Sequence, residues 1–321
     1  MENFLICEQH DELLGKVYRM ECQKDGCLAS EALLAPEKGF NLFYWAAAGF
    51  PILYCLKEEL AATGFGGMPV LYPAPNRTEN GKFTYDGRAY QLEKNGSARE
   101  IHGLVYDEPW QVEGTKCTDG SCQVAGRIDF TKGSRLFASF PFEHSLQVTY
   151  RLTADSLSMA YLIESRSDRP FPLGLGVHTY FTEPEPDITL KVPTGRRFFS
   201  DSLHFPHGIG AVEGAYDLRT PKNVKTLDLD DVYTDLGGKT SEIIYPSLQK
   251  KLCLSGSEAF QNAVVFTPPG EPFFCYENQT CMTNALNSQE LGLYEESGLI
   301  ILEPGASCSG NLRFRLEDLK G

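Results

Sequence analysis

Apolar and polar residues alternate along most of the chain with the period of two that is typical of β-strands. The clearest example is residues 144–165, where two alternating runs flank the turn sequence Thr-Ala-Asp-Ser. The apolar positions of the two runs are Leu146, Val148, Tyr150, Leu152, Leu157, Met159, Tyr161 and Ile163. Because two such runs around a short turn form antiparallel neighbours, this segment is predicted to be a β-hairpin.

The same alternation recurs in residues 15–39, around Asp25-Gly26, in residues 81–92, around Asp86-Gly87, and in residues 309–317. Asp-Gly pairs favour tight hairpin turns, so the first two segments are also predicted to be hairpins. A helical period of 12 or more residues is found nowhere, and at most a turn or two of helix is indicated near residues 55–63. The pattern therefore predicts an all-β fold, a large and mostly antiparallel β-sandwich.

Turn-forming residues are spread evenly, with 30 glycines and 19 prolines distributed over the 321 residues. The sequence contains no proline-, glycine- or serine-rich linker, no sustained run of charge and no repeat of fixed period. We therefore expect residues 1–321 to form a single domain, although the pattern does not define its strand order.

The charge balance narrows the choice of partners. The chain carries 43 acidic and 29 basic side chains, a net charge of −14, which argues against nucleic acid or an anionic membrane as a partner. The N-terminal residues are acidic where a signal peptide needs basic ones, and proline and glycine interrupt the longest apolar stretch. A soluble cytoplasmic protein is expected.

The ten cysteines form no C-x2-C pair and have no histidine at a zinc-ligand spacing, so no metal site and no cofactor are expected. Free thiols in a reducing compartment are the simpler interpretation. A pairing of Cys22 with Cys27, or of Cys117 with Cys122, across hairpins stays open.

Four segments carry polar residues that a plain strand or turn does not need. They place Asn76-Arg77 on a proline-rich arm, His102 before Gly103, His178 in the apolar run LGLGVHTYF, and Glu277 after the strand-like FFCY. Each has a plain structural interpretation: an exposed arginine on a rigid loop, histidines held in the core, and a strand-end acid reaching water. Each feature taken alone is more often structural than functional.

Taken together, the four segments predict a site. Strand ends that bring imidazole, carboxylate and guanidinium groups beside aromatic rings are suited to a sugar, which presents apolar ring faces and many hydroxyls. A histidine and a carboxylate on opposite sides of a ring also form a general acid/base pair that needs no cofactor. The sequence has no G-x-S-x-G elbow, G-x-G-x-x-G motif or P-loop, which disfavours serine hydrolysis and nucleotide chemistry.

The same segments resemble the aldose 1-epimerases, or mutarotases, of the galactose mutarotase-like superfamily. The similar stretches occur in the family's order within residues 30–318: GGMPVLYPAPNRTENGKFTYDGRAYQL, IHGLVYDEPW, GVHTYF, LDDVYTDL and CYENQTCMTNALN. Each motif alone is weak, but five in order are specific. The resemblance implies a β-supersandwich and the interconversion of the α and β anomers of an aldose.

The resemblance also implies roles for individual residues. Glu277 would take the proton from the anomeric hydroxyl, and His178 would protonate the ring oxygen. The remaining residues would hold the sugar hydroxyls: Asn76, Arg77, His102 and Asp230. Asp230 is preferred to its acidic neighbours because its spacing to Tyr233 fits the Asp-x-x-aromatic motif.

The sequence departs from the family pattern at two places. Many relatives carry an arginine after the His-Gly segment, where this chain has Tyr106-Asp107-Glu108, and Asn278-Gln279 also differs from many relatives. Acids in place of a basic cluster favour a neutral sugar over a sugar phosphate, and Arg196-Arg197 is assigned to a loop edge that either carries basic charge or is simply solvated. A hexose-6-phosphate 1-epimerase and a non-catalytic sugar-binding protein on the same fold remain the alternatives.

The remaining candidate histidines, His144, His204 and His207, are assigned to the core or the surface. The oligomeric state is left open.

Overall fold

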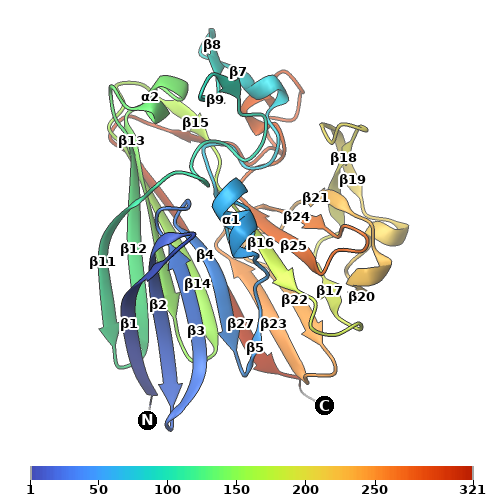
Figure 1. Cartoon of the computed structure of the whole chain (residues 1–321). Coiled ribbons are helices and arrows are strands. Elements are labelled where there is room, and N and C mark those ends of the chain that lie inside the picture. Colours follow the sequence, from blue (N-terminus) through green and yellow to red (C-terminus); the bar gives the residue numbers. More distant parts are fainter. Residues whose placement is uncertain (1, 320–321) are drawn as a thin grey trace.

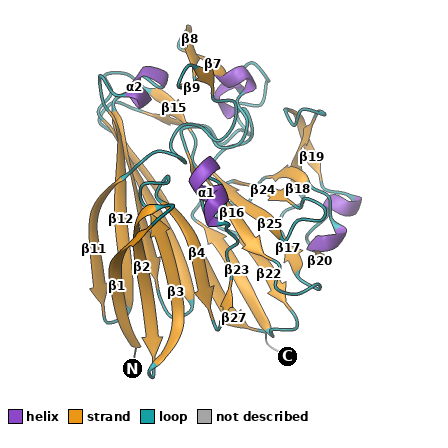
Figure 2. Ribbon diagram, in the orientation of Figure 1, coloured by secondary structure: helices purple, strands orange, loops and turns teal. Residues whose placement is uncertain are grey.

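The structure is a computed structural model that describes residues 2–319. Strands dominate it, as predicted, and all pairings between the strands it describes are antiparallel. The first sheet has five strands in chain order: β1 (Glu2–Asp11), β2 (Gly15–Lys24), β3 (Cys27–Ala35), β4 (Asn41–Ala47) and β5 (Phe50–Pro51). Figures 1 and 2 show this sheet lying across part of a longer one.

The longer sheet has nine strands. Its order is β11 (Gln111–Thr118), β12 (Ser121–Phe130), β13 (His144–Leu152), β14 (Ser156–Ser165), β27 (Ser307–Asp318), β23 (Lys250–Gly256), β22 (Thr240–Tyr245), β17 (Thr189–Lys191) and β20 (Lys222–Asn223). The hairpins predicted for residues 15–39 and 144–165 are therefore β2–β3 and β13–β14, and both predictions are confirmed.

The third sheet carries the candidate residues. Its seven strands run in the order β19 (Pro206–Ala211), β18 (Arg196–Ser200), β21 (Asp230–Tyr233), β24 (Asn262–Phe266), β25 (Phe273–Gln279), β16 (Gly176–Thr182) and β6 (Val70–Leu71). Its inner face packs on the nine-stranded sheet: the Phe181 ring lies 6.1 Å from that of Phe314, and the Tyr276 and Ser241 hydroxyls are 2.7 Å apart. The five- and seven-stranded sheets thus form one layer against the nine-stranded sheet.

Smaller elements gather at one end of this sandwich (Figure 1). They include the predicted hairpin β7 (Lys82–Tyr85) and β8 (Arg88–Gln91), and the pairs β9 (Glu93–Lys94) with β10 (Ser97–Ala98) and β15 (Phe171–Leu173) with β26 (Ile300–Leu302). The helices are α1 (Lys57–Thr63), α2 (Arg135–Ser139) and the single turns η1 (Glu79–Gly81), η2 (Gly214–Tyr216), η3 (Val224–Thr226) and η4 (Ala285–Asn287). The turn of helix indicated near residues 55–63 is α1.

One continuous hydrophobic core runs through the three sheets, from Phe4 to Leu316. His144 belongs to it: its ring is fully buried, stacks 4.2 Å from that of Phe130, and has its two nitrogens 2.7 Å from the Tyr72 hydroxyl and from the Phe142 carbonyl. Both ring nitrogens therefore have partners, and this histidine is structural.

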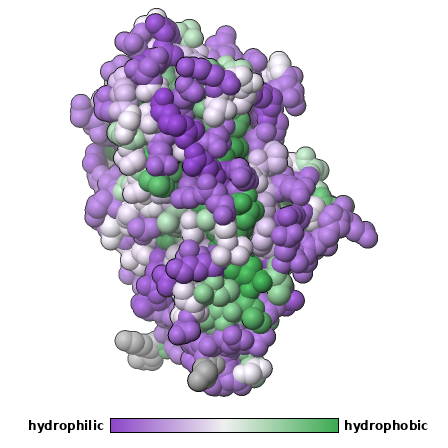
Figure 3. All heavy atoms as spheres, turned by 90° about the vertical axis from the view of Figure 1, so that its left-hand side faces the viewer, coloured by the Kyte–Doolittle hydropathy of each residue, from purple (hydrophilic) through white to green (hydrophobic). Residues whose placement is uncertain are grey.

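The outer surface reflects the composition. Figure 3 shows one side of the molecule as predominantly hydrophilic, with a smaller apolar area in its lower half. The ten cysteines are free thiols, and Cys117 and Cys122 face each other directly in the β11–β12 ladder, whereas Cys22 lies opposite Ser30 rather than Cys27. No helix among the described residues has the length and apolar character needed to span a bilayer.

Candidate active site

His178 and Glu277 lie side by side in the seven-stranded sheet. They are direct partners in the antiparallel register of β16 and β25, and Nε2 of His178 is 3.1 Å from Oε1 of Glu277. Both residues are almost fully buried, with exposed fractions of 6% and 3%. The contact follows from strand pairing, because side chains directly opposite each other on one face of a ladder come within reach.

Aromatic rings fix the imidazole of His178. Tyr180, two residues further along β16 and so on the same face, stacks on it with centroids 4.5 Å apart and planes 11° apart. The ring of His102 stands nearly perpendicular to it at 5.1 Å, and Phe65 lies 5.6 Å from His102 and 6.4 Å from His178. These contacts leave the imidazole of His178 little freedom to rotate.

The proline-rich arm brings Asn76 and Arg77 to the same place. Asn76 has a left-handed backbone, φ 58°, its carbonyl accepts a hydrogen bond from the His102 N–H, and Arg77 bridges to Ile101. The turn at Gly103 requires glycine, because φ is +70° and a Cβ there would lie 2.3 Å from the carbonyl oxygen of Tyr72. The loop after β25 holds the other side of the arm, since the Asn284 N–H donates to the Arg77 carbonyl.

Arg77 and Asp230 form an ion pair that lines the same site as the histidine–glutamate pair. Nη2 of Arg77 is 3.4 Å from Oδ2 of Asp230, and Nη1 donates to the Asn76 side-chain oxygen at 3.3 Å. The same carboxylate oxygen of Asp230 lies 3.3 Å from Nδ1 of His204. Asp230 is thereby held from two sides.

These groups line one pocket. Its volume is about 270 Å³, and its walls contain all six residues predicted from the sequence, namely Asn76, Arg77, His102, His178, Asp230 and Glu277. Phe65, Ile101, Tyr180 and Phe266 complete the lining. The pocket thus combines an acid/base pair, a guanidinium, three further polar groups and aromatic faces.

Burial dominates the electrostatics of the pair. It lowers the pKa of His178 to about 3, and it raises the pKa of Glu277 well above its ordinary value. The charge of Asp230 raises the pKa of Glu277 further, against the Gln279 amide and the Arg77 guanidinium, which lower it. Burial, followed by the charges of His178 and Arg77, lowers the pKa of His102 well below its ordinary value.

Three site features lie outside the sequence predictions. Gln279 is fully buried and donates from Nε2 to Oε2 of Glu277 at 3.0 Å, so it orients the carboxylate. Its position two residues after Glu277 could have indicated this contact, because residues i and i+2 of a strand lie on the same face. His204, assigned to the core or the surface, is partly exposed and also contacts Asp230, and no local pattern indicates this contact. Phe266 comes from β24, between the two strands that carry Glu277 and Asp230.

The acids at 107 and 108 do not line the pocket. Asp107 is paired with Lys94 and Arg99, and Glu108 with Lys94, so both carboxylates are engaged in ion pairs away from it. Tyr106, their neighbour, stacks on Phe65 with centroids 5.0 Å apart. The segment therefore supports the aromatic wall rather than placing acidic charge against a ligand.

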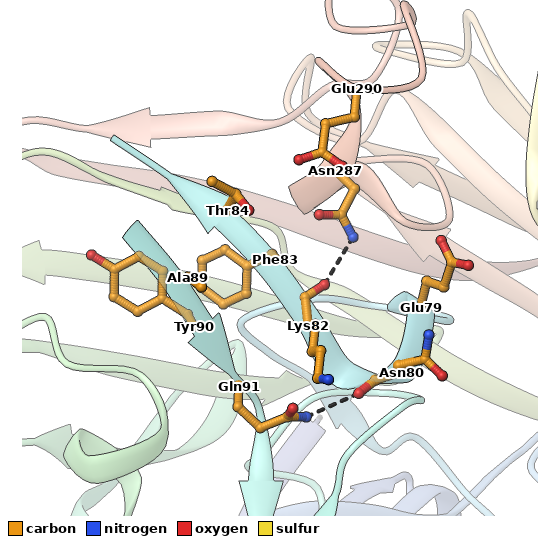
Figure 4. A pocket seen from close by; sticks show the side chains of 10 residues that line it. All are labelled: Glu79, Asn80, Lys82, Phe83, Thr84, Ala89, Tyr90, Gln91, Asn287 and Glu290. Carbon is orange, nitrogen blue, oxygen red and sulfur yellow. Dashed lines mark hydrogen bonds between the residues drawn. The ribbon is translucent and has the colours of Figure 1, made fainter. Parts of the chain in front are cut away.

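Another hollow, of about 470 Å³, lies between the β7–β8 hairpin and η4, apart from the candidate site (Figure 4). Its side chains tie the hairpin to neighbouring loops: Asn287 donates to the Lys82 carbonyl at 2.9 Å, and Gln91 donates to the Asn80 carbonyl at 2.9 Å. None of the six predicted residues lines it. Within residues 2–319 no three His, Cys, Asp or Glu side chains are grouped so that they could hold a metal ion.

The chain resembles known proteins both in sequence and in structure. The chain is 34% identical over 128 residues to the uncharacterized protein YihR of Escherichia coli K12, and 28% identical over 133 residues to the uncharacterized protein YphB of the same strain. These alignments cover 39% and 41% of this chain and span only 38% and 42% of the relatives' own lengths.

Solved structures match over nearly the whole chain. A galactose mutarotase-like protein from Clostridium acetobutylicum superposes with a TM-score of 0.83 at 23% identity, covering 98% of this chain and 99% of that one. A galactose 1-epimerase from Lactobacillus acidophilus NCFM gives 0.74 at 17% identity, covering 99% of each chain. These likenesses establish the fold, a galactose mutarotase-like supersandwich. The model of the family described as aldose 1-epimerase matches residues 47–315, most of the chain, and the chain belongs to that family.

Proposed function

We propose that the protein is an aldose 1-epimerase that interconverts the α and β anomers of a neutral aldose. The observation that carries the proposal is the contact of 3.1 Å between His178 Nε2 and Glu277 Oε1, two buried groups in a pocket that Arg77 and Asp230 also line. A volume of about 270 Å³ falls just below the range of roughly 300–1,000 Å³ that is usual for drug-sized ligands. A pocket of this volume favours a ligand the size of one monosaccharide.

The reaction needs two proton transfers at one ring position. The Glu277 carboxylate removes the proton from the anomeric hydroxyl O1, the C1–O1 bond becomes a carbonyl, and the bond between C1 and the ring oxygen O5 breaks as His178 delivers its proton to O5. The open-chain aldehyde then turns about C1–C2. Closure on the other carbonyl face returns the O5 proton to His178 and the Glu277 proton to O1, and both catalytic groups are restored.

The directions of the two pKa shifts are compatible with these proton transfers. Burial favours a protonated Glu277 and a neutral His178, and the reactive pair, carboxylate and imidazolium, carries the same single proton. Moving that proton across the contact of 3.1 Å therefore changes neither the net charge nor the proton count of the pair. Sugar hydroxyls that hydrogen-bond to the carboxylate stabilise its ionised form and so favour the reactive arrangement.

Charge in the pocket favours a neutral sugar. Arg77 is the one guanidinium that lines it among the described residues, and it is already paired with Asp230. Arg196 and Arg197 are paired with Asp235 and Asp231. A sugar phosphate would have to compete with carboxylates for each of these cations, which disfavours a hexose-6-phosphate substrate.

A non-catalytic sugar-binding protein would use the same pocket, so the discriminating experiment is kinetic. Freshly dissolved α-glucose, α-galactose, α-xylose and α-glucose 6-phosphate are followed by polarimetry with wild type and with Glu277→Gln and His178→Asn. We expect acceleration over buffer by wild type and a loss of about 10²–10⁴-fold in each variant, the usual weight of a general acid or base. Matched exposed substitutions, Glu303→Gln and His10→Asn, are the controls. No acceleration of any sugar together with saturable binding would support the binding protein instead.

A further inference from the structure

Two other parts of the chain hold the arm that carries Arg77 (residues 76–79). The segment of His102 pairs with it, since the His102 N–H donates to the Asn76 carbonyl at 2.8 Å. The loop after β25 holds it through Asn284, which does not itself line the pocket. Any effect of Asn284 on a bound sugar therefore has to pass through the arm.

Asn284 binds the arm at two points. Its N–H donates to the Arg77 carbonyl at 2.8 Å, and its Oδ1 accepts a hydrogen bond from the Glu79 N–H at 3.2 Å. Oδ1 also accepts from Nδ2 of Asn287 at 2.8 Å, and the same Nδ2 donates to the Lys82 carbonyl at 2.9 Å (Figure 4). One side chain thus fixes the backbone at the arginine and again two residues beyond it.

The backbone of Asn284 is left-handed, with φ 58° and ψ 28°, a conformation that asparagine, aspartate and glycine adopt more readily than other residues. The residue is 1% exposed, and its Nδ2 has no hydrogen-bond partner within residues 2–319. The arm therefore uses the side-chain oxygen and not the NH2 group. An aspartate would keep that oxygen, and a glycine would keep the backbone without it.

Asn284 also belongs to the chain segment that follows Glu277. Between these two residues the chain is fixed, because the Met282 N–H donates to the Ser297 carbonyl at 2.8 Å and the Met282 side chain is fully buried. The contacts made by Asn284 therefore set the position of Arg77 relative to the strand that carries Glu277.

We propose that Asn284 is a positioning residue, which holds the Arg77 guanidinium in place for the sugar without contacting the sugar itself. This inference rests on the proposed function, in which Arg77 binds sugar hydroxyls. The guanidinium reaches Asp230 at 3.4 Å and the Asn76 side chain at 3.3 Å, both longer than the usual range of roughly 2.7–3.2 Å. Because these contacts are long, the side chain depends on the backbone of the arm for its placement. Loss of Asn284 Oδ1 should weaken sugar binding and leave the proton transfers of the acid/base pair nearly unchanged.

The test measures kcat and KM by proton NMR of anomer exchange, and the Kd of the same sugar by calorimetry. Asn284→Gly keeps the left-handed backbone and the N–H but lacks Oδ1, and we expect it to raise KM and Kd about fivefold, the weight of one ordinary hydrogen bond, with kcat within about twofold. Asn284→Asp keeps an acceptor oxygen in either ionisation state and should stay within about twofold of wild type. Asn95→Gly, at an exposed asparagine with φ 54°, is the matched control and should change none of these constants.

A double-mutant cycle separates positioning from a general loss of order. In an Arg77→Lys background the guanidinium is gone, so Asn284→Gly should raise Kd by less than about twofold. Urea unfolding of each variant shows that the proteins compared are folded.

Three results would overturn the positioning role: an unchanged KM and Kd in Asn284→Gly, the same increase in the presence and absence of Arg77, or an increase in Asn284→Asp as large as in Asn284→Gly. Failure of the proposed function gives a different result. Wild type would then accelerate no aldose, while the Kd ratios of the variants would still report whether Asn284 positions Arg77.

Discussion

Replacing Glu277 by glutamine should make the protein more stable at neutral and alkaline pH while abolishing most of its activity. Glutamine keeps the shape of the side chain and can still accept the hydrogen bond that Gln279 donates at 3.0 Å. It removes only the ionisable group, which is 3% exposed and whose pKa burial raises well above its ordinary value. The variant therefore isolates the free energy that ionising this carboxyl in the pocket costs the fold.

The sign follows from proton binding. Above about pH 4.3, the ordinary glutamate pKa, the unfolded chain has released the proton that folded Glu277 retains. The folded state then binds more protons than the unfolded state, so the contribution of Glu277 to stability is full below that pH and is lost as pH rises towards the folded pKa. Within this window wild type should lose up to about 1.4 kcal/mol per pH unit relative to the variant.

If only wild type were measured, the titration of His178 would mask this effect. Its pKa is lowered to about 3, so between there and about pH 6.5, the ordinary histidine pKa, its contribution rises with pH and opposes that of Glu277. The difference between the variant and wild type cancels the His178 contribution, because both proteins contain it. We expect the difference in the free energy of unfolding to grow steadily with pH.

Urea unfolding at half-unit steps from pH 4 to pH 8.5 measures this difference. Glu303→Gln, at an exposed glutamate, is the matched control and should run parallel to wild type. A constant difference between Glu277→Gln and wild type over the whole range would refute the reasoning, because it would mean that Glu277 ionises in the folded protein as easily as in the unfolded chain.

Three further substitutions test the surroundings of the pair. Gln279→Leu removes a donor to the Glu277 carboxylate, so the acid limb of the kcat/KM profile should move up by about one pH unit, measured by polarimetry. Arg77→Lys removes the planar guanidinium whose two Nη atoms donate to Asn76 and Asp230, and we expect the KM for the sugar to rise about tenfold with a smaller change in kcat. His144→Phe leaves a core hydroxyl and a backbone carbonyl unpaired, and should cost about 1–3 kcal/mol per group in urea unfolding with activity retained.

The alternation of residues predicted the strands and several hairpins, because burial of one strand face is a local property. Strand order is not local: β16 and β25 are neighbours although about a hundred residues separate His178 from Glu277 along the chain, and nothing in either segment indicates which strand pairs with which. Once the order is known, the contact follows from the register. Five of the six site residues were recognisable because each is polar beside apolar, glycine-rich or proline-rich residues, whereas Asp230 lies in an acidic run and was assigned only through the resemblance.

What the sequence did not reveal depends on contacts between distant loops. His204 meets Asp230 because a β18–β19 hairpin returns beside β21, and its own surroundings, LHFPHG, look like any polar loop. The hollow lined by Phe199, Tyr216 and Phe266 is likewise assembled from residues 197–216 and 228–269, of which only LDDVYTDL was recognised as a motif. Its aromatic residues are indistinguishable in sequence from those of the core.

Magnetisation exchange between the α and β anomeric protons of an aldose at equilibrium tests the central claim most directly, because it observes the interconversion itself without a net reaction. We expect wild type to produce exchange cross-peaks between the two anomers for at least one neutral aldose, and both Glu277→Gln and His178→Asn to reduce the exchange rate at least about a hundredfold. Undiminished exchange in either variant, or none with wild type for any aldose, would contradict the account of the pair as the acid and base of an epimerase.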